Sequence, residues 1–197
     1  IGALESTAAT RLPPILARFH RRYPAVGLEL VTGTTGALIA KVMNHEIEAA
    51  FVAEPFTADA LEGDPVFCEE LVLITPRSFR KVKTPRDIGR TTLIAFAAGC
   101  SYRRRLEAWL GDAQVVPERV MEFGSYHAIV ACVAAGAGIA IVPRSVIRVS
   151  LAGSGVATSS LPPAVAKART VFVWRRGHHS MALDAMRAEL RRSMRRS

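Results

Sequence analysis

The sequence predicts an α/β fold with mostly parallel sheets. Short apolar runs alternate with stretches of helical periodicity along the 197 residues, 50% of which are hydrophobic and 22% charged. This composition is typical of a globular protein with a buried core, and alternation of strands with helices favours parallel strand pairing. The strands are expected at residues 26–32, 48–53, 71–75, 91–96, 119–123, 139–142 and 170–175.

Amphipathic segments lie between these strands. Residues 12–19 carry apolar side chains at the i, i+3, i+4, i+7 spacing of a core-facing helix, although Pro13 and Pro14 leave its start undefined. A capping motif at residues 84–87 predicts a short helix with Pro85 at its first position. Further helices are expected at residues 38–43, 101–110, 125–135 and 180–194, with Gly111 and Gly136 as the stops of the second and third.

The longest uncharged, mostly apolar run covers residues 128–143 and is interrupted by Gly136, Gly138 and Pro143. It is shorter than the roughly 20 residues of a membrane span. We interpret it as a buried helix, a glycine turn and a buried strand. The chain opens at Ile1 without a signal peptide and without Met, so an excised fragment is expected.

The net charge of +9 suggests nucleic-acid binding, but its distribution does not. Five arginines and one glutamate fall within residues 187–197, so +4 of the +9 belongs to that segment. The other cations are scattered, without the basic run and interleaved aromatic residues of a strand-binding groove. Direct DNA binding by this chain is therefore not expected.

The cysteines and histidines predict no metal site, no disulfide framework and no cofactor. Cys68, Cys100 and Cys132 form no CxxC pair, and the five histidines lack metal-ligand spacing. An odd number of unpaired cysteines fits a reducing cytoplasm. No nucleophile elbow or other catalytic signature frames the Ser, His and Asp residues, so enzymatic activity is not expected.

Four short polar clusters, at residues 5–7, 33–35, 99–101 and 124–126, each open a predicted helix. In open α/β sheets such junctions lie at the carboxyl ends of strands, where ligands bind. Helix N-termini attract carboxylate, sulfate or phosphate groups. A helix N-cap is the simpler interpretation of any single cluster, whereas four clusters in one small chain favour a shared anion-binding cleft.

Residues 100–105 leave two alternatives open. Cys100 at a helix N-terminus beside Arg103, Arg104 and Arg105 could be a reactive thiolate, but no resolving cysteine lies close in sequence, and a plain cleft-wall cysteine is the default. Three consecutive helical residues point in different directions, so at most one arginine would face the cleft. A solvated basic face is the simpler interpretation of the three arginines.

Residues 133–143 read VAAGAGIAIVP, a V-x-x-G-x-G-I-A-x-x-P pattern. Together with LPPILARF at 12–19, IEAAF at 47–51 and ELVLITP at 70–76, this pattern resembles the effector-binding domain of LysR-type bacterial transcription regulators over nearly the whole chain. Glu48 is a mild departure, because the family usually carries Asp at that position.

The resemblance implies two Rossmann-like lobes of the type 2 periplasmic-binding-protein kind, joined by two crossing strands. Lobe I would comprise residues 1–75 with 169–197, and lobe II residues 76–168. An N-terminal winged helix-turn-helix would be absent from this chain. The family's effector cleft coincides with the four polar clusters, so two lines of reasoning indicate the same effector-binding residues: Ser6, Thr7, Thr34, Thr35, Gly99, Cys100, Ser101, Tyr102, Ser125 and Tyr126.

The sequence therefore predicts the effector-sensing domain of a LysR-type regulator in the cytoplasm. It would bind a small, polar, anionic metabolite between the lobes and relay their closure to the missing domain, through which alone promoter DNA would be contacted. The expected assembly is a homodimer, and a homotetramer at full length, without membrane contact. Two alternatives stay open: a periplasmic solute-binding protein, which a secretion signal would favour, and an enzyme on the same scaffold, which would require turnover of a bound metabolite.

Overall fold

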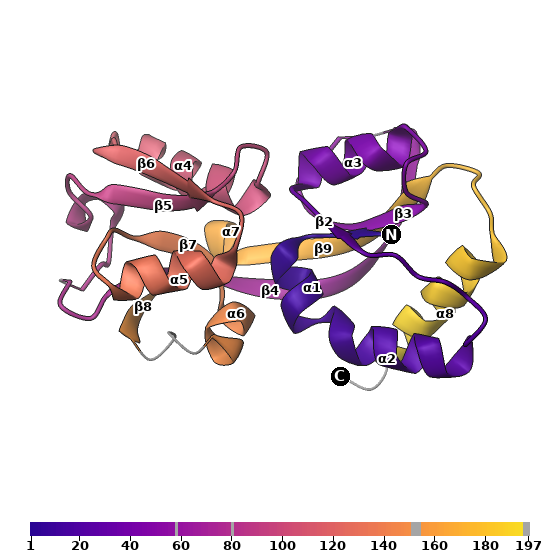
Figure 1. The fold of residues 1–197 in the computed structure, drawn as a ribbon. Helices are drawn as coiled ribbons and strands as arrows, with labels where there is room; N and C mark the ends of the chain where they lie inside the picture. The colour runs from indigo at the N-terminus through magenta and orange to yellow at the C-terminus, as the bar shows by residue number, and fades with distance from the viewer. Residues whose placement is uncertain (58, 80, 151–154, 195–197) are drawn as a thin grey trace. The chain divides into compact units, whose positions relative to one another are not determined.

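The computed structural model describes residues 1–57, 59–79, 81–150 and 155–194, and its chain divides into two compact units (Figure 1). Unit 1 comprises Ile1–Cys68 with Arg169–Ser197, and unit 2 comprises Glu69–Ala168. Strands β4 (Leu61–Pro76) and β9 (Lys167–Arg175) each run across one of these boundaries. The chain therefore leaves unit 1 once, in β4, and returns to it once, in β9.

The sheet of unit 1 has the strand order β2-β1-β3-β9, with β4 beside β9. Strand β1 (Gly2–Ala3) pairs in parallel with β2 (Val31–Thr32) and with β3 (Ala49–Ala53), whereas β9 pairs antiparallel with β3. Because β1, β2 and β3 run in the same direction, their carboxyl ends meet at one edge of the sheet.

Helices cover both faces of this sheet (Figure 1). One face carries α3 (Thr35–Met43), and the other carries α1 (Glu5–Thr10), α2 (Leu12–Arg22) and α8 (Met181–Met194). The core beneath α2 and α8 includes Phe51 and Phe172, whose ring centroids are 4.6 Å apart. On the opposite face, a Cβ on Gly2 would come within 2.6 Å of Leu38 Cδ2, so the glycine allows α3 to pack closely on β1.

Unit 2 combines an antiparallel group with a parallel strand pair. Strands β7 (Ala140–Pro143) and β8 (Val156–Ser160) pair antiparallel with β4, and β5 (Thr92–Phe96) pairs in parallel with β6 (Arg119–Phe123). The described helices of unit 2 are the 3-10 helix η1 (Pro85–Asp87), α4 (Ser101–Asp112), α5 (Tyr126–Ala134), α6 (Arg144–Val149) and α7 (Pro163–Ala166).

The glycine segment of the VAAGAGIAIVP pattern connects α5 to β7. Gly136 has φ 91°, a conformation that side chains other than glycine rarely adopt. Gly138 is required by close backbone approach, because an added Cβ would lie 2.3 Å from the Thr92 carbonyl oxygen. The amide of Ile139 donates to that same oxygen at 3.0 Å and so joins this segment to β5. The prediction of a buried helix, a glycine turn and a buried strand is confirmed.

Three predictions about the elements are wrong. The strand expected at residues 26–32 contains only Val31 and Thr32, because β2 is an exposed edge strand that pairs with the two residues of β1. The sheets are mixed rather than mostly parallel, since β9 runs antiparallel to β3, and β7 and β8 run antiparallel to β4. Helix α4 continues through Gly111 to Asp112, so this glycine is not its stop.

Other expected elements lie close to their predicted bounds. Helix α2 begins at Leu12 and accepts Pro13 in its first turn, where a missing N–H costs no intrahelical hydrogen bond. The capping box that Thr84 forms with Asp87 is present at the start of η1. Among the described residues, no helix combines the length and the apolar character that crossing a membrane requires.

Candidate functional site

Three segments of unit 1 place polar side chains at the carboxyl edge of its sheet. Helix α1 follows β1, helix α3 follows β2, and β3 ends at Ala53. The register pairs Ala3 with Thr32 on one side and with Phe51 on the other, so the three strands end beside one another. The polar clusters at residues 5–7 and 33–35 therefore lie at the same edge.

Ser6 and Thr7 are buried in the first turn of α1, with exposed fractions of 2% and 1%. Neither hydroxyl has a hydrogen-bond partner among the residues that the structure describes. The N-cap of α1 is Leu4, so these hydroxyls do not cap the helix. A buried hydroxyl without a partner costs about 1–3 kcal/mol, which makes each of them a candidate contact for a bound molecule.

Thr34 and Thr35 already have bonds within the fold. The Thr34 side chain caps α3 by accepting a hydrogen bond from the Ala37 amide at 3.4 Å. The buried Thr35 Oγ1 accepts from the Ala53 amide at 3.2 Å and donates to the Ala53 carbonyl at 3.4 Å. Thr35 thus fixes the start of α3 to the end of β3.

Thr170 is a polar residue of this edge that sequence reasoning missed. It is fully buried in β9, in register with Ala53, and its Oγ1 has no hydrogen-bond partner within the described ranges. A single threonine at the start of a predicted strand forms no polar cluster, so only the antiparallel register of β3 and β9 reveals its position.

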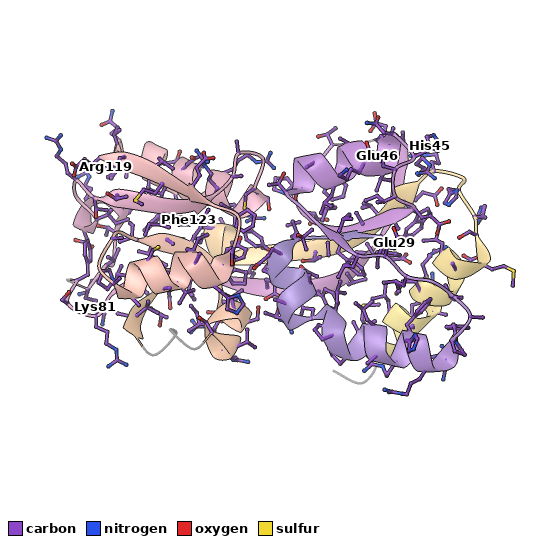
Figure 2. The ribbon with its side chains drawn as sticks, in the orientation of Figure 1. Glu29, His45, Glu46, Lys81, Arg119 and Phe123 are labelled. Atoms are coloured by element: carbon purple, nitrogen blue, oxygen red, sulfur yellow. The ribbon has the colours of Figure 1, made fainter. Side chains whose placement is uncertain are left out.

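The two remaining clusters lie at the carboxyl edge of the β5–β6 pair. The register joins Phe96 to Phe123, so both strands end together, and Figure 2 labels Phe123 at this end. Gly99 has φ 88° in the turn that leads from β5 to α4. The N-cap residues of α4 and α5 are Cys100 and Ser125, and neither makes a side-chain capping hydrogen bond. Of the four clusters, only the one at residues 33–35 therefore caps its helix through a side chain.

Ser101 is 1% exposed, and its Oγ lacks a hydrogen-bond partner in the described part of the chain. Its neighbours instead pack together: Cys100 Sγ lies 3.8 Å from the Tyr126 hydroxyl, and the rings of Tyr102 and Tyr126 have centroids 6.5 Å apart. The cavity beside these three side chains measures about 10 Å³, too small for a ligand. Ser101 thus has a buried hydroxyl that is available for a ligand.

Arg103 is held by two carboxylates and does not belong to a solvated basic face, so that interpretation is wrong for this residue. Its Nε donates to Glu107 at 2.7 Å, and its Nη1 pairs with Glu122 and donates to the Phe96 carbonyl at 3.2 Å. The hydrogen bond to Glu107 and, to a smaller extent, the hydrogen bond to Glu122 raise the pKa of the Arg103 guanidinium. These contacts connect α4 to the end of the β5–β6 pair through the Arg103 side chain.

The cysteines show no arrangement for metal or disulfide chemistry. Cys68, Cys100 and Cys132 are free thiols, and Cys100 is only 5% exposed. Among the described residues, no three or more His, Cys, Asp or Glu side chains are grouped to hold a metal ion. The burial of Cys100 removes the access that a reactive thiolate needs.

The chain consists of two α/β units that are joined by two strands, and each unit has polar strand-to-helix junctions at a sheet edge. This arrangement is typical of domains that bind small molecules. The LysR substrate binding domain family matches residues 1–195. The chain belongs to this family.

Curated relatives include two HTH-type transcriptional regulators of Bacillus subtilis (strain 168). GltR is 41% identical over 147 residues, which cover 75% of this chain and 50% of GltR. CzcR is 38% identical over 173 residues, which cover 88% of this chain and 58% of CzcR. The chain thus spans about half the length of these relatives. The family is one of transcription regulators, which confirms the prediction of a non-enzymatic domain.

Solved structures with the same fold include regulatory domains with bound small molecules. The Synechocystis PCC6803 CcmR regulatory domain in complex with 2-PG has a TM-score of 0.86 at 20% identity, covering 98% of this chain and 95% of that one. The effector binding domain of QuiR in complex with shikimate has a TM-score of 0.83 at 16% identity, covering 99% and 95%. These likenesses confirm the predicted fold, which resembles type 2 periplasmic binding proteins.

Proposed function

We propose that this chain is an effector-sensing domain that binds a small, polar, anionic metabolite. The observation that carries the proposal is a set of buried hydroxyls for which the described residues offer no partner: Ser6, Thr7 and Thr170 in unit 1, and Ser101 in unit 2. Ser6, Thr7 and Ser101 follow the ends of strands, and Thr170 lies in β9 opposite Ala53, the last residue of β3. A ligand with several oxygen acceptors would receive their hydrogen bonds and offset the cost of burying them.

Two features support an anion over a neutral ligand. Helices α4 and α5 carry no side-chain cap, so their first-turn amides and the positive ends of their dipoles are available to a negative group. Related domains have been solved with shikimate and with benzoate, both of which are carboxylates. Because Arg103 is already paired, we propose that hydroxyl and amide donors, rather than this guanidinium, hold the carboxylate of the effector.

We propose further that hydroxyls from both units contact the same ligand. Such a ligand would bind more tightly to an arrangement of the units in which both sets of contacts are made than to one in which only one set is made. This difference in affinity is what would allow the ligand to act as a signal. Strands β4 and β9 are the two connections through which the units would change their arrangement.

We propose that the change in the arrangement of the units on ligand binding regulates transcription. The curated relatives are HTH-type regulators about twice as long as the matched region, which supports a DNA-binding domain elsewhere in the full-length protein. Promoter DNA would be contacted through that domain, in the cytoplasm, by a homodimer or homotetramer. The same relatives give no support to a transport role or to an enzyme.

A thermal-shift screen of the chain tests the anion assignment. The screen contains small carboxylic acids, each beside its neutral primary amide or alcohol analogue. At about 100 times its dissociation constant, a binding acid adds about 2.7 kcal/mol of stability, which raises the unfolding midpoint by about 5–11 °C. We expect stabilisation by an acid and not by its neutral analogue. Stabilisation by the neutral analogues alone would overturn the assignment.

A further inference from the structure

We infer that unit 1 carries a second anion site, for a phosphate-type oxyanion, in an arginine-lined pocket between α2 and α8. The pocket measures about 320 Å³, within the range of small-ligand sites. Its lining consists of Arg18, Arg21, Arg22, Glu189 and Arg192. Four guanidinium groups and one carboxylate give these residues a combined formal charge of +3.

A buried carboxylate fixes two of the four guanidinium groups. Glu189 is 3% exposed, accepts from Arg18 Nε at 2.9 Å and lies 3.5 Å from Arg192 Nη1. Arg18 Nη2 also donates to Ser193 Oγ at 3.0 Å. These contacts hold Arg18 and Arg192 in position, and each guanidinium keeps further N–H donors, since it carries five.

The other two guanidinium groups, those of Arg21 and Arg22, are held by no direct side-chain contact of this kind within the described part of the chain. Arg21 and Arg22 are exposed, and neither forms an ion pair or a side-chain hydrogen bond with the described residues. Cations in the last turn of a helix complement its dipole, which accounts for each of them separately. It does not account for their convergence with Arg18 and Arg192 on one pocket, where a single carboxylate offsets four like charges that repel one another.

Phosphate chemistry fits this pocket better than a monocarboxylate. A phosphate group carries up to two negative charges and several acceptor oxygens, which match the planar donor forks of more than one arginine. The pocket residues belong to α2 and α8 and include none of the buried hydroxyls at the sheet edges. The site is therefore separate from the proposed effector site, and its test does not depend on that site.

Calorimetric titration of the chain with inorganic pyrophosphate tests the inference. The double variant R21A/R22A removes two exposed arginines without disturbing the Arg18–Glu189 pair, and its fold is checked by its thermal midpoint. The matched control R86A/R90A removes the same charge from two exposed positions of unit 2. We expect saturable binding that R21A/R22A weakens by about tenfold or more, because each loss removes charge-assisted hydrogen bonds, and that R86A/R90A leaves unchanged.

Three results would overturn the inference. Pyrophosphate could fail to bind saturably, or both double variants could weaken binding equally, which would make the effect one of net charge. Random duplex DNA could also bind through Arg21 and Arg22 while pyrophosphate does not, which would identify a nucleic-acid contact surface instead of a small-anion pocket.

Discussion

At the scale of single residues, hydroxyls that look alike in sequence have different bonds in the structure. Thr35 exchanges two hydrogen bonds with Ala53, whereas Ser101 has an equally buried hydroxyl for which the described residues supply no partner. A substitution that removes each hydroxyl should therefore have different effects on stability.

Thr35→Val is predicted to lower the free energy of unfolding by about 1–2 kcal/mol, because the buried Ala53 amide loses its partner. Ser101→Ala is predicted to raise it by about 1–3 kcal/mol in the ligand-free chain, because the variant no longer buries a hydroxyl without a partner among the described residues. Urea denaturation of both variants measures the difference. Equal destabilisation would mean that Ser101 has an internal partner and is not available to a ligand.

Glu189 is predicted to make stability depend on pH. Its burial raises the carboxyl pKa, but the hydrogen bond from Arg18, the charges of Arg18 and Arg22 and the hydrogen bond from Arg192 together lower it below 4.5. A carboxyl with a lowered folded-state pKa stabilises the fold above its unfolded-state pKa, and that contribution is lost as the pH falls through the folded-state pKa. Wild type should thus lose this stability as the pH falls below about 4.5.

Chemical denaturation across this acidic range, with wild type beside Glu189→Gln, checks the pH dependence. The variant cannot titrate at this position and should show a shallower decline. The matched control is Glu29→Gln, which changes an exposed residue of the same unit and should behave as wild type. Figure 2 labels Glu29. Equal slopes for wild type and Glu189→Gln would contradict the prediction.

The candidate site could be predicted from sequence only in part. Hydroxyl clusters after predicted strands mark strand-to-helix junctions, and Ser6, Thr7 and Ser101 lie at such junctions. The sequence did not separate these residues from Thr35, because hydrogen bonds to Ala53 depend on where β3 ends. Thr170 lies more than 100 positions away from Ala53 in the chain, and only strand register brings the two together.

At the scale of elements, two glycines illustrate opposite constraints. Gly111 lies inside α4, where an added Cβ meets nothing within 4 Å, whereas a Cβ at Gly138 would meet the Thr92 carbonyl at 2.3 Å. Gly111→Ala is predicted to raise the free energy of unfolding by about 0.5–1 kcal/mol, since alanine restricts the unfolded chain and favours helix. Gly138→Ala is predicted to lower it by about 1–3 kcal/mol.

Thermal unfolding of the two variants checks this pair of predictions, which differ in sign for the same chemical change. A destabilised Gly111→Ala would show that α4 ends before this glycine, as the sequence predicts and the structure does not. An unaffected Gly138→Ala would show that the close approach to β5 is absent.

The elements that could be predicted are those with their own apolar pattern. Strands β3, β5, β6 and β7 lie within one residue of their predicted bounds. Strands β3, β5 and β7 are compact apolar runs, whereas β6 carries Arg119 and Glu122 among its apolar residues. The strand predicted at residues 71–75 covers only the second half of β4, since the first half contains Gly63 and Pro65 and has no apolar pattern of its own. This first half is extended because it lies beside β9, where a Cβ on Gly63 would come within 2.6 Å of Val171. Strand direction leaves no trace in periodicity, so the antiparallel pairings were not predicted.

At the scale of the whole molecule, we propose a homodimer that pairs α2 of one chain with α5 of its partner. Ile129, Val130 and Val133 of α5 are buried within unit 2, so the contact with the partner would use the other side of this helix. The exposed surface of α5 includes Ala131.

Light scattering at tens of micromolar is predicted to give the mass of a dimer, since a dimer with a dissociation constant of about 1 μM would be mostly assembled there. Ala131→Glu places a charge on the exposed side of α5 and is predicted to give monomers with an unchanged thermal midpoint. A monomeric wild type, or a dimer that Ala131→Glu leaves intact, would contradict this pairing.

We propose that buried hydroxyls of both units bind one anionic ligand. Calorimetric titration with the acid that emerges from the thermal-shift screen tests it in wild type, Ser6→Ala and Ser101→Ala, with Ser160→Ala as a control at an exposed hydroxyl of unit 2. Loss of one hydrogen bond to a charged group should raise the dissociation constant about tenfold or more in each of the first two variants and leave the control unchanged. If Ser6→Ala and Ser101→Ala both bind the acid as tightly as wild type, these hydroxyls are not ligand contacts and the site has been placed in the wrong part of the fold.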